Sequence, residues 1–334
     1  MILVTGGTGL VGSHLLYKLA NNSKKIRAIY RSEAKLEVAK KIFSYYTSDT
    51  SLFESIEWVK TDLLNLPDLE AAFKNVTQVY HCAALVSFDP NDYIALKRTN
   101  TLGTANIVNL CLSYKVSKLC YVSSVATLGQ SLTDTPITEE TFWNPEEDNN
   151  VYAITKYGAE MEVWRGTQEG LDAIIVNPGV ILGSGAWNQG SGNLFYKVYN
   201  HLNYYTNGIT GFVAVEDVVD IMMTLMAMDI KNQNYILVSE HWSYKKLLQT
   251  IAKHLGVKIP HNEIQPWQAK LGWRLDWLRH KVTGKKRSLS KQMAKTIVSQ
   301  SQYSSEKITA LLNYKWTAID TTIQSICKQF KNEL

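Results

Sequence analysis

The fold of this 334-residue chain is constrained most by a glycine-rich segment, Thr5-Gly6-Gly7-Thr8-Gly9-Leu10-Val11-Gly12. The segment follows a short apolar run, residues 2–5, and opens a stretch of helical period, residues 10–20. Glycines between a strand and a helix allow a sharp turn and let a phosphate approach the helix N-terminus. Two dinucleotide-loop spacings fit, one starting at Gly6 and one at Gly7. The residues expected to contact a dinucleotide here are Gly6, Thr8, Gly9, Leu10, Val11 and Gly12.

Apolar runs of strand length alternate with helical segments through the first half of the chain. This alternation is typical of a parallel sheet covered on both faces. The sequence therefore predicts an α/β fold, a doubly wound parallel sheet of the Rossmann type with a smaller, mostly helical C-terminal substrate lobe. We expect the dinucleotide-binding domain at residues 1–180 and 211–243, and the lobe at residues 181–210 and 244–334. Among the expected elements are a loop at 183–192, strands at 119–123 and 211–215, and helices at 93–114, 151–168 and 216–228.

The end of the second expected strand, residues 26–30, indicates which dinucleotide binds. NAD-dependent enzymes hold the ribose 2′-hydroxyl with an Asp or Glu at the end of this strand, and residues 26–32 of this chain contain no Asp or Glu. Arg31 instead offers a guanidinium group to a 2′-phosphate, with Ser32 and Lys35 close by. NADP(H) is therefore the expected cofactor, and NAD(H) is the alternative.

Two later strand ends supply the other cofactor contacts that we expect. Asp62, followed by Leu63, can accept a hydrogen bond from the adenine amino group, or can cap a helix. Ala83 and Ala84 let the main chain run close to the ribose and pyrophosphate. His81, just before them, is expected to be a core residue bonded to the backbone.

Tyr152 and Lys156 are four residues apart at the start of an expected helix, which places both side chains on one helix face. A neighbouring ammonium group favours phenolate, so we expect Lys156 to lower the pKa of Tyr152 from its ordinary value of about 10. Lys156 can also hold the cofactor ribose. Ser124 ends a strand at the same sheet edge and can orient the reacting oxygen.

In combination these motifs resemble the extended short-chain dehydrogenase/reductases of the NAD-dependent epimerase/dehydratase superfamily, over nearly the whole chain. The resemblance implies that Tyr152 is the catalytic acid/base, that Lys156 is its partner, and that Ser124 orients a carbonyl. The implied reaction is reduction of a carbonyl by hydride transfer from NADPH, or the reverse oxidation of an alcohol, with Tyr152 exchanging the proton.

The resemblance also implies roles for residues outside these motifs. Asn100, in Thr99-Asn100-Thr101, is implied as a supporting catalytic residue. Pro178 and Val180, in Asn177-Pro178-Gly179-Val180, are implied to face the nicotinamide. This segment and residues 205–208 are most similar to the branch of dihydroflavonol reductases and 3β-hydroxysteroid dehydrogenases.

Two other functions stay open. A sugar-nucleotide epimerase or dehydratase would recycle its NAD(P), but such enzymes commonly carry an Arg where this chain has Gly211. A non-catalytic dinucleotide-sensing protein usually lacks the catalytic tyrosine, here Tyr152.

We expect a lipophilic ketone, aldehyde or alcohol as substrate, because the loops expected around the nicotinamide are rich in apolar side chains. These side chains are Val86, Phe88, Tyr93, Thr127, Leu128, Trp143, Trp187, Leu194, Phe195 and Tyr196.

Cysteine spacing and the N-terminal sequence indicate the compartment. The four scattered cysteines contain no Cys-x-x-Cys pair and predict reduced thiols rather than a disulfide framework or a zinc site. The sequence contains no apolar run of membrane-spanning length and no signal-like start. We therefore expect a cytoplasmic protein.

The net charge of +5 is unevenly distributed, since residues 251–300 hold eleven Lys or Arg against two acids, Glu263 and Asp276. No zinc-finger or basic-zipper pattern accompanies them, so nucleic-acid binding is not expected. Residues 270–295 interleave cations with Leu and Trp, which fits a solvated helix, a lid over the substrate, or weak contact with an anionic membrane surface.

The helices at 93–114 and 151–168 pair in family dimers, so a homodimer is expected. The apolar residues that favour it are Ala153, Ala159, Met161, Val163 and Trp164.

Overall fold

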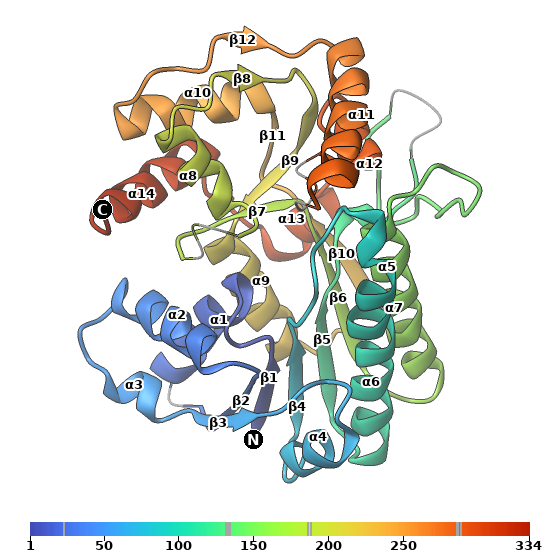
Figure 1. Cartoon of the computed structure of the whole chain (residues 1–334). Coiled ribbons are helices and arrows are strands. Elements are labelled where there is room, and N and C mark those ends of the chain that lie inside the picture. The colour runs from blue at the N-terminus through green and yellow to red at the C-terminus, as the bar shows by residue number, and fades with distance from the viewer. Residues whose placement is uncertain (23, 131–134, 186, 188, 285–286, 288) are drawn as a thin grey trace.

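A computed structural model describes all residues of the chain except 23, 131–134, 186, 188, 285–286 and 288. Its central sheet has seven parallel strands in the order β10-β6-β5-β4-β1-β2-β3 (Figure 1). The chain builds outward from β1 to β3 and then returns to β4 on the other side, so the strand order reverses between β1 and β4. Ligands of such sheets bind at the carboxyl ends of the strands, near this reversal. The strands are β1 (Ile2–Thr5), β2 (Ile26–Tyr30), β3 (Glu57–Lys60), β4 (Gln78–His81), β5 (Lys118–Val122), β6 (Ala173–Pro178) and β10 (Gln233–Leu237).

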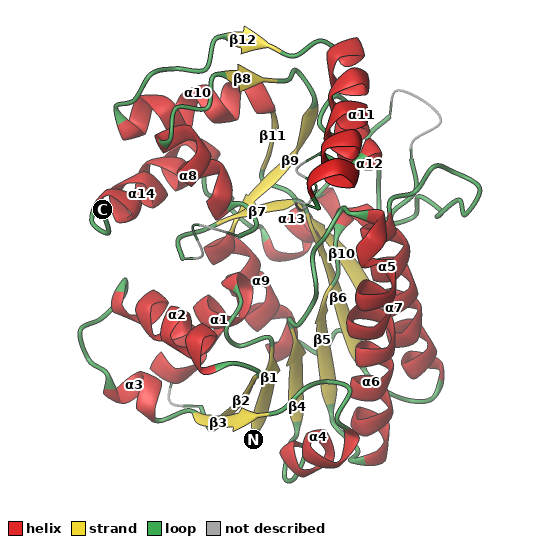
Figure 2. Cartoon of the chain, in the orientation of Figure 1, coloured by secondary structure: helices red, strands yellow, loops and turns green. Residues whose placement is uncertain are grey.

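Helices cover both faces of this sheet (Figure 2). Consecutive strand residues explain why: Leu3 and Val4 are both fully buried, but they belong to apolar cores on opposite faces. The two-sided burial confirms the predicted doubly wound α/β fold. One core contains residues of α1 (Leu10–Asn21), α2 (Glu33–Ser44), α3 (Ser51–Glu54) and α9 (Val215–Ala227), and the other contains residues of α4 (Leu66–Ala72), α6 (Gly103–Ser113) and α7 (Val151–Gln168).

The expected continuous helix at 93–114 is interrupted in the structure. After a short 3₁₀ turn, η1 (Pro90–Asp92), the chain forms α5 (Tyr93–Leu96) and then one π-helical segment, η2 (Lys97–Leu102), before α6 begins. A π-helical turn inserts an extra residue into the helix and redirects side chains, and such turns occur frequently at functional sites.

A second lobe lies above the carboxyl ends of the sheet (Figure 1). A three-stranded sheet, ordered β11-β9-β7, forms part of it, so β9 and β11 pair there whereas β10 joins the central sheet. The strands are β7 (Val180–Leu182), β9 (Ile209–Ala214) and β11 (Glu240–Ser243), with a small pair, β8 (Tyr204–Tyr205) and β12 (Asn262–Glu263). The lobe's own core contains residues of α8 (Gly192–Tyr199), α10 (Tyr244–Leu255) and α14 (Ile319–Lys331). Residues 186 and 188 of the expected loop at 183–192 lie outside the described residues.

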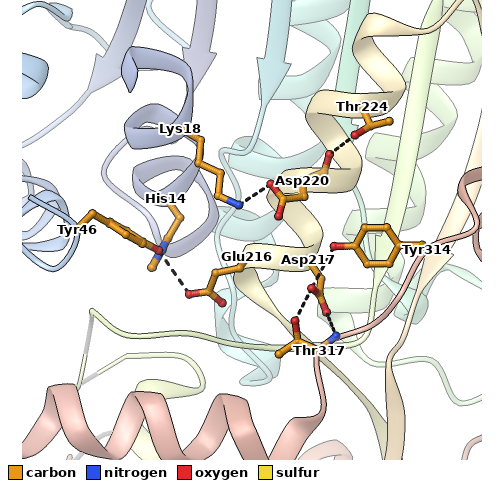
Figure 3. A network of polar contacts seen from close by, with 9 residues as sticks. All are labelled: His14, Lys18, Tyr46, Glu216, Asp217, Asp220, Thr224, Tyr314 and Thr317. Atoms are coloured by element: carbon orange, nitrogen blue, oxygen red, sulfur yellow. Dashed lines mark hydrogen bonds and ion pairs between the residues drawn. The ribbon is translucent and has the colours of Figure 1, made fainter. Parts of the chain in front are cut away.

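Figure 3 shows a polar network that ties α1 to α9 and to the C-terminal segment. Lys18 of α1 pairs with Asp220 of α9 at 2.5 Å. Asp217, which is buried, accepts hydrogen bonds from the Tyr314 hydroxyl at 3.1 Å and the Thr317 hydroxyl at 2.8 Å. The C-terminal segment is thereby fixed to the dinucleotide-binding half.

The remaining helices are α11 (Pro266–Thr283), α12 (Lys291–Thr296) and α13 (Glu306–Leu312). Within the described part of the chain, no helix is both long enough and apolar enough to span a bilayer. Residues 285–286 and 288 of the basic segment 270–295 lie outside that part.

Three of the five residues that favoured a homodimer, Ala153, Ala159 and Val163, are buried inside the chain itself. They lie on the buried side of α7 and cannot form a dimer surface. The homodimer therefore remains a prediction that rests on the exposed Met161 and the partly buried Trp164.

Candidate active site

The glycine loop between β1 and α1 brings backbone groups closer together than side chains would allow. Gly6 has a φ of 68°, and a Cβ there would lie 2.6 Å from the Ala83 nitrogen. A Cβ on Gly12 would lie 2.2 Å from the Gly6 carbonyl oxygen. Helix α1 begins after Gly9 without a side-chain cap and without an acid in its first turn, so the N–H groups of that turn favour an anion. This cradle fits a dinucleotide pyrophosphate.

The other residues predicted for the loop line the same cradle. Thr8 is half-buried, and Leu10 and Val11 form the first turn of α1 and are partly buried. Ala83 and Ala84 follow β4 directly opposite Gly6, with Ala84 exposed. All of these residues therefore surround the reversal point between β1 and β4.

Arg31 and Asp62 meet at the adjoining edge, beyond β2 and β3. The Arg31 guanidinium lies 3.4 Å from the Asp62 carboxylate, and both side chains are about half exposed. Asp62 also accepts a hydrogen bond from the Leu64 N–H at 2.9 Å. Leu63 differs, because its side chain is buried against Gly103 in the core. An exposed ion pair of this length is weak, so it leaves the guanidinium able to exchange Asp62 for another anion.

Tyr152 and Ser124 come together at the carboxyl end of β5. Helix α7 starts at Val151 because the Asn150 side chain caps it, accepting from the Ala153 N–H at 2.8 Å. Tyr152 in its first turn forms a hydrogen bond with the Ser124 side chain, and its ring lies 5.6 Å from that of Phe88. The structure thus places two hydroxyl groups and an aromatic side chain at one point.

The expected lowering of the Tyr152 pKa is wrong. Burial raises the pKa of Tyr152 to about 12, and the hydrogen bond with Ser124 opposes this only in part. Lys156 has no part in the shift, because its amino group is itself buried and bonded elsewhere: it donates to the Tyr121 hydroxyl at 2.6 Å and the Val122 carbonyl at 2.8 Å. Burial also lowers the pKa of Lys156 to about 7. Four-residue spacing predicted the shared helix face but not these tertiary partners.

A buried chain of side chains continues from Lys156 toward the glycine loop. Tyr121 is hydrogen-bonded to Thr104, and His81 joins Thr104 at 2.9 Å on one side and Thr5 at 2.5 Å on the other. His81 is thus a core residue as expected, but it bonds to side chains rather than to the backbone. Burial lowers the pKa of His81 to about 3, so the ring is neutral and links two hydroxyl groups.

Asn100 lies in the π-helical segment η2, buried between the chain after β4 and helix α7. Its side-chain oxygen accepts from the Leu85 N–H at 2.7 Å, and its amide donates to the Leu85 carbonyl at 3.0 Å and the Thr155 hydroxyl at 3.2 Å. Asn100 is a positioning residue in this arrangement, because it fixes the segment after β4 against the helix that carries Tyr152.

Glu160, one turn beyond Lys156 on α7, was not predicted from the sequence. This buried carboxylate accepts from Ser123 at 2.5 Å, Thr127 at 2.7 Å and Asn177 at 2.9 Å. It thereby joins the ends of β5 and β6 to α7, just behind Ser124. An acid four residues after Lys156, on the same helix face, was the available signal.

The segment after β6 brings Pro178 and Val180 to the carboxyl edge of the sheet. Pro178 pairs with Leu237 of β10, and Val180 begins β7, half-buried, opposite Phe212. Gly211, just before Phe212, is packed tightly: a Cβ there would lie 2.6 Å from the Val238 side chain. This position has no room for a larger side chain.

The apolar residues predicted to line the substrate site divide into two groups. Phe88 contacts Tyr152, and Trp143 stacks on Tyr157 of α7 at 4.6 Å. Most of the others serve the protein's own packing or lie on its surface. Thr127, Leu128 and Phe195 are buried, Trp187 packs on Phe330 and donates to Glu333 at 2.6 Å, Leu194 is partly buried, and Val86, Tyr93 and Tyr196 are exposed.

Comparison with known proteins agrees with this geometry. Residues 2–237 match the model of the NAD dependent epimerase/dehydratase family. A putative dihydroflavonol 4-reductase of Synechocystis sp. is 26% identical over 98% of this chain and 94% of its own length. Sterol demethylase protein B of Methylococcus capsulatus is 26% identical over 79% of this chain and 77% of its own. UDP-glucose 4-epimerase of Vibrio cholerae is 26% identical over 72% and 70%, respectively.

Solved structures share the fold. The crystal structure of gox2253 superimposes with a TM-score of 0.80 at 24% identity, covering 100% of this chain and 98% of the other. UDP-glucose 4-epimerase of Thermus thermophilus, in complex with NAD, has a TM-score of 0.76 at 18% identity, covering 100% and 99%. Fold, glycine loop and family match agree. The chain belongs to the NAD-dependent epimerase/dehydratase family of extended short-chain dehydrogenase/reductases and is an NAD(P)-dependent oxidoreductase.

Proposed function

We propose that this enzyme is an NADP(H)-dependent reductase of lipophilic ketones or aldehydes, which in reverse oxidises the corresponding alcohols. The observation that carries the proposal is the Tyr152 hydroxyl, which is protonated at neutral pH, hydrogen-bonded to Ser124 and next to the ring of Phe88. A protonated phenol suits donation of a proton to a carbonyl oxygen, and an aromatic neighbour suits an apolar substrate.

The chain's own residues account for the acid–base half of this reaction. A carbonyl oxygen placed between Ser124 and Tyr152 accepts a hydrogen bond from each, and these donors stabilise the negative charge that develops on it. Tyr152 then transfers its proton to that oxygen. When bound, the nicotinamide cofactor supplies the hydride for the carbonyl carbon. Lys156 would hold the cofactor ribose, and the turn from Gly6 to Gly12 would hold the pyrophosphate.

Preference for NADP(H) is proposed from Arg31. Its guanidinium is half exposed at the end of β2, where it forms a 3.4 Å contact with Asp62. The nearest acid along the chain, Glu33, already accepts from the Tyr30 hydroxyl at 3.0 Å and pairs with Lys60. A 2′-phosphate would therefore meet an available guanidinium rather than a free carboxylate.

An NAD(P)-recycling epimerase is the second candidate, favoured by the Vibrio cholerae relative. Against it stands the tight packing of Gly211 on Val238, which leaves no room for a diphosphate-binding arginine at that position.

A cytoplasmic location is proposed as well. All four cysteines are free, as expected for thiols in a reducing compartment.

Initial rates of NADPH oxidation with aromatic aldehydes, cyclic ketones and nucleotide sugars test the proposal. We expect turnover with the aldehydes or ketones, and a higher kcat/KM with NADPH than with NADH. Activity confined to nucleotide sugars would overturn the proposal. Purified protein holding a cofactor that does not exchange would support the epimerase instead.

A further inference from the structure

Helix α11 (Pro266–Thr283) is attached to the rest of the protein by a narrow face. Of its 18 residues, all described, only Ala269 is buried. The attached face also includes Gly272 and Asp276, which lie against Leu289 of the following segment: a Cβ on Gly272 would be 3.4 Å from the Leu289 side chain, and Asp276 accepts from the Leu289 N–H at 3.1 Å. Figure 1 shows α11 at the edge of the second lobe, beside α12.

The opposite face of α11 carries large apolar side chains in solvent. They occur at intervals of four, four, three and four residues, which places them in one stripe along the helix. At about 100° per residue, this stripe is centred roughly opposite Ala269. Its members are Trp267, Leu271, Leu275, Leu278 and Val282, with exposed fractions between 48% and 76%. A stripe of this size facing water marks a contact surface rather than a solvated helix.

Cations flank this stripe along one side. Lys270, Arg274 and Lys281 are exposed, at angles that place them between the stripe and the attached face. The charged ends of two of them lie over aromatic rings of the same helix: the Arg274 guanidinium carbon is 4.8 Å from the centre of the Trp273 ring, and the Lys281 Nζ is 4.4 Å from that of Trp277.

The acid of this helix does not offset those cations at the stripe. Asp276 is the one acid in its sequence, and it pairs with Arg279 at 2.6 Å on the attached side. The exposed face is therefore apolar at its centre and basic along its edge.

We propose that α11 docks on the surface of an anionic lipid bilayer, with the stripe in the acyl–headgroup boundary and the cations among the headgroups. An apolar face bordered by Lys and Arg is the composition of helices that lie in a membrane interface. A second copy of the chain fits less well, since two such helices face to face would bring the same cations together with no acids to meet them. The inference goes beyond the proposed function and does not depend on it.

Co-sedimentation of the purified full-length protein with sucrose-loaded vesicles tests the proposal. Vesicles of phosphatidylcholine with about one-third phosphatidylglycerol should pellet the protein, vesicles of pure phosphatidylcholine should not, and about 0.5 M salt should release it. At about fivefold per cation, the variant without the three flanking cations should bind on the order of 100-fold more weakly. The test variants are Lys270→Gln/Arg274→Gln/Lys281→Gln and Leu271→Ser/Leu275→Ser.

A matched control removes three exposed lysines at the amino-terminal edge of the central sheet, as Lys24→Gln/Lys74→Gln/Lys115→Gln. This variant has the same net charge as the cation variant of α11 and should bind anionic vesicles like the unmodified protein. Equal losses in both triple variants would mean that net charge alone drives binding, and would overturn the proposal. Absence of binding to anionic vesicles would overturn it as well.

Light scattering tests whether a second copy of the chain, rather than a lipid surface, covers the stripe. If the protein is a dimer that Leu271→Ser/Leu275→Ser converts to single chains, the stripe is an interface between copies and the lipid proposal is wrong. Thermal unfolding followed by circular dichroism checks that each variant folds. If the serine variant does not fold, the comparison of the cation variant with its matched control still tests the proposal. Sedimentation requires no turnover, so its failure would leave the proposed reductase function standing.

Discussion

Replacing Tyr121 by Phe removes one oxygen from the surroundings of Lys156 and leaves the rest in place. The Lys156 amino group has two hydrogen-bond acceptors, the Tyr121 hydroxyl at 2.6 Å and the Val122 carbonyl at 2.8 Å, and it lies 4.3 Å from the centre of the Tyr121 ring. A phenyl ring preserves the packing and the ring contact. The variant therefore isolates the hydroxyl group as a positioning element for Lys156.

The size of the effect follows from the charge of the donor. A hydrogen bond to a charged group contributes about 1.5–3 kcal/mol, and about 1.4 kcal/mol corresponds to one pKa unit. Losing the bond destabilises the ammonium form, so the pKa of Lys156 should fall by about one unit, taking the lower end of this range, from its value of about 7. Two of the three ammonium N–H groups are bonded to Tyr121 and Val122, and the third is the one that would hold the cofactor ribose. Cofactor binding is therefore present below this pKa and is lost as the pH rises through it.

The assay is kcat/KM for NADPH as a function of pH, which reports groups of the free enzyme. The kcat/KM for NADPH of the Tyr121→Phe variant should be about twofold lower than that of the unmodified enzyme near pH 6, and about tenfold lower near pH 8. Tyr80→Phe is the matched control, since Tyr80 is a buried tyrosine on the neighbouring strand whose side chain packs in the core on the other face. An unchanged pH profile in Tyr121→Phe, or the same change in Tyr80→Phe, would refute the reasoning.

Two further predictions concern the cofactor and acid stability. Arg31→Gln should lower kcat/KM for NADPH by about 10- to 100-fold, which corresponds to the loss of one charge-assisted hydrogen bond. The kcat/KM for NADH should change by less than about twofold. Equal losses for both cofactors would argue against a 2′-phosphate site. His14 and His81 are buried with pKa values lowered by burial to about 4 and about 3, so the unfolded chain binds more protons below its own histidine pKa of about 6.5. Above that pH the two histidines do not change the free energy of unfolding. As the pH falls toward their folded-state pKa values, the free energy of unfolding should decline, by about 2 kcal/mol for each histidine near pH 5. Urea unfolding near pH 7.5 and pH 5 measures this decline, and His14→Gln should remove about half of it; equal stability at both pH values would contradict it.

Much of the fold could be predicted because it depends on local patterns. The helix expected at 151–168 is found as α7 with the same bounds, since its cap, Asn150, is the residue directly before it in the sequence. The glycine loop was equally predictable, because the close approach of Gly12 to the Gly6 carbonyl tolerates no side chain.

Features that depend on contacts between distant segments could not be predicted in this way. The π-helical segment η2 interrupts an otherwise regular helical pattern, and Asn100 within it bonds to Leu85 and to Thr155, which is 55 residues away. The three-residue strand β7 exists because β9 pairs with it. The Lys156 amino group was likewise expected beside Tyr152, but the hydroxyl of Tyr121 fixes its position and burial lowers its pKa.

Tyr152→Phe tests the central claim, that the Tyr152 hydroxyl is the proton donor, most directly. A phenyl ring retains the contact with Phe88 and removes only the oxygen that is hydrogen-bonded to Ser124. Loss of a general acid should lower kcat for carbonyl reduction by about 10²- to 10⁴-fold, while NADPH binding, measured by fluorescence titration, should change less than about twofold. Turnover within a few-fold of the unmodified enzyme would contradict the assignment of Tyr152.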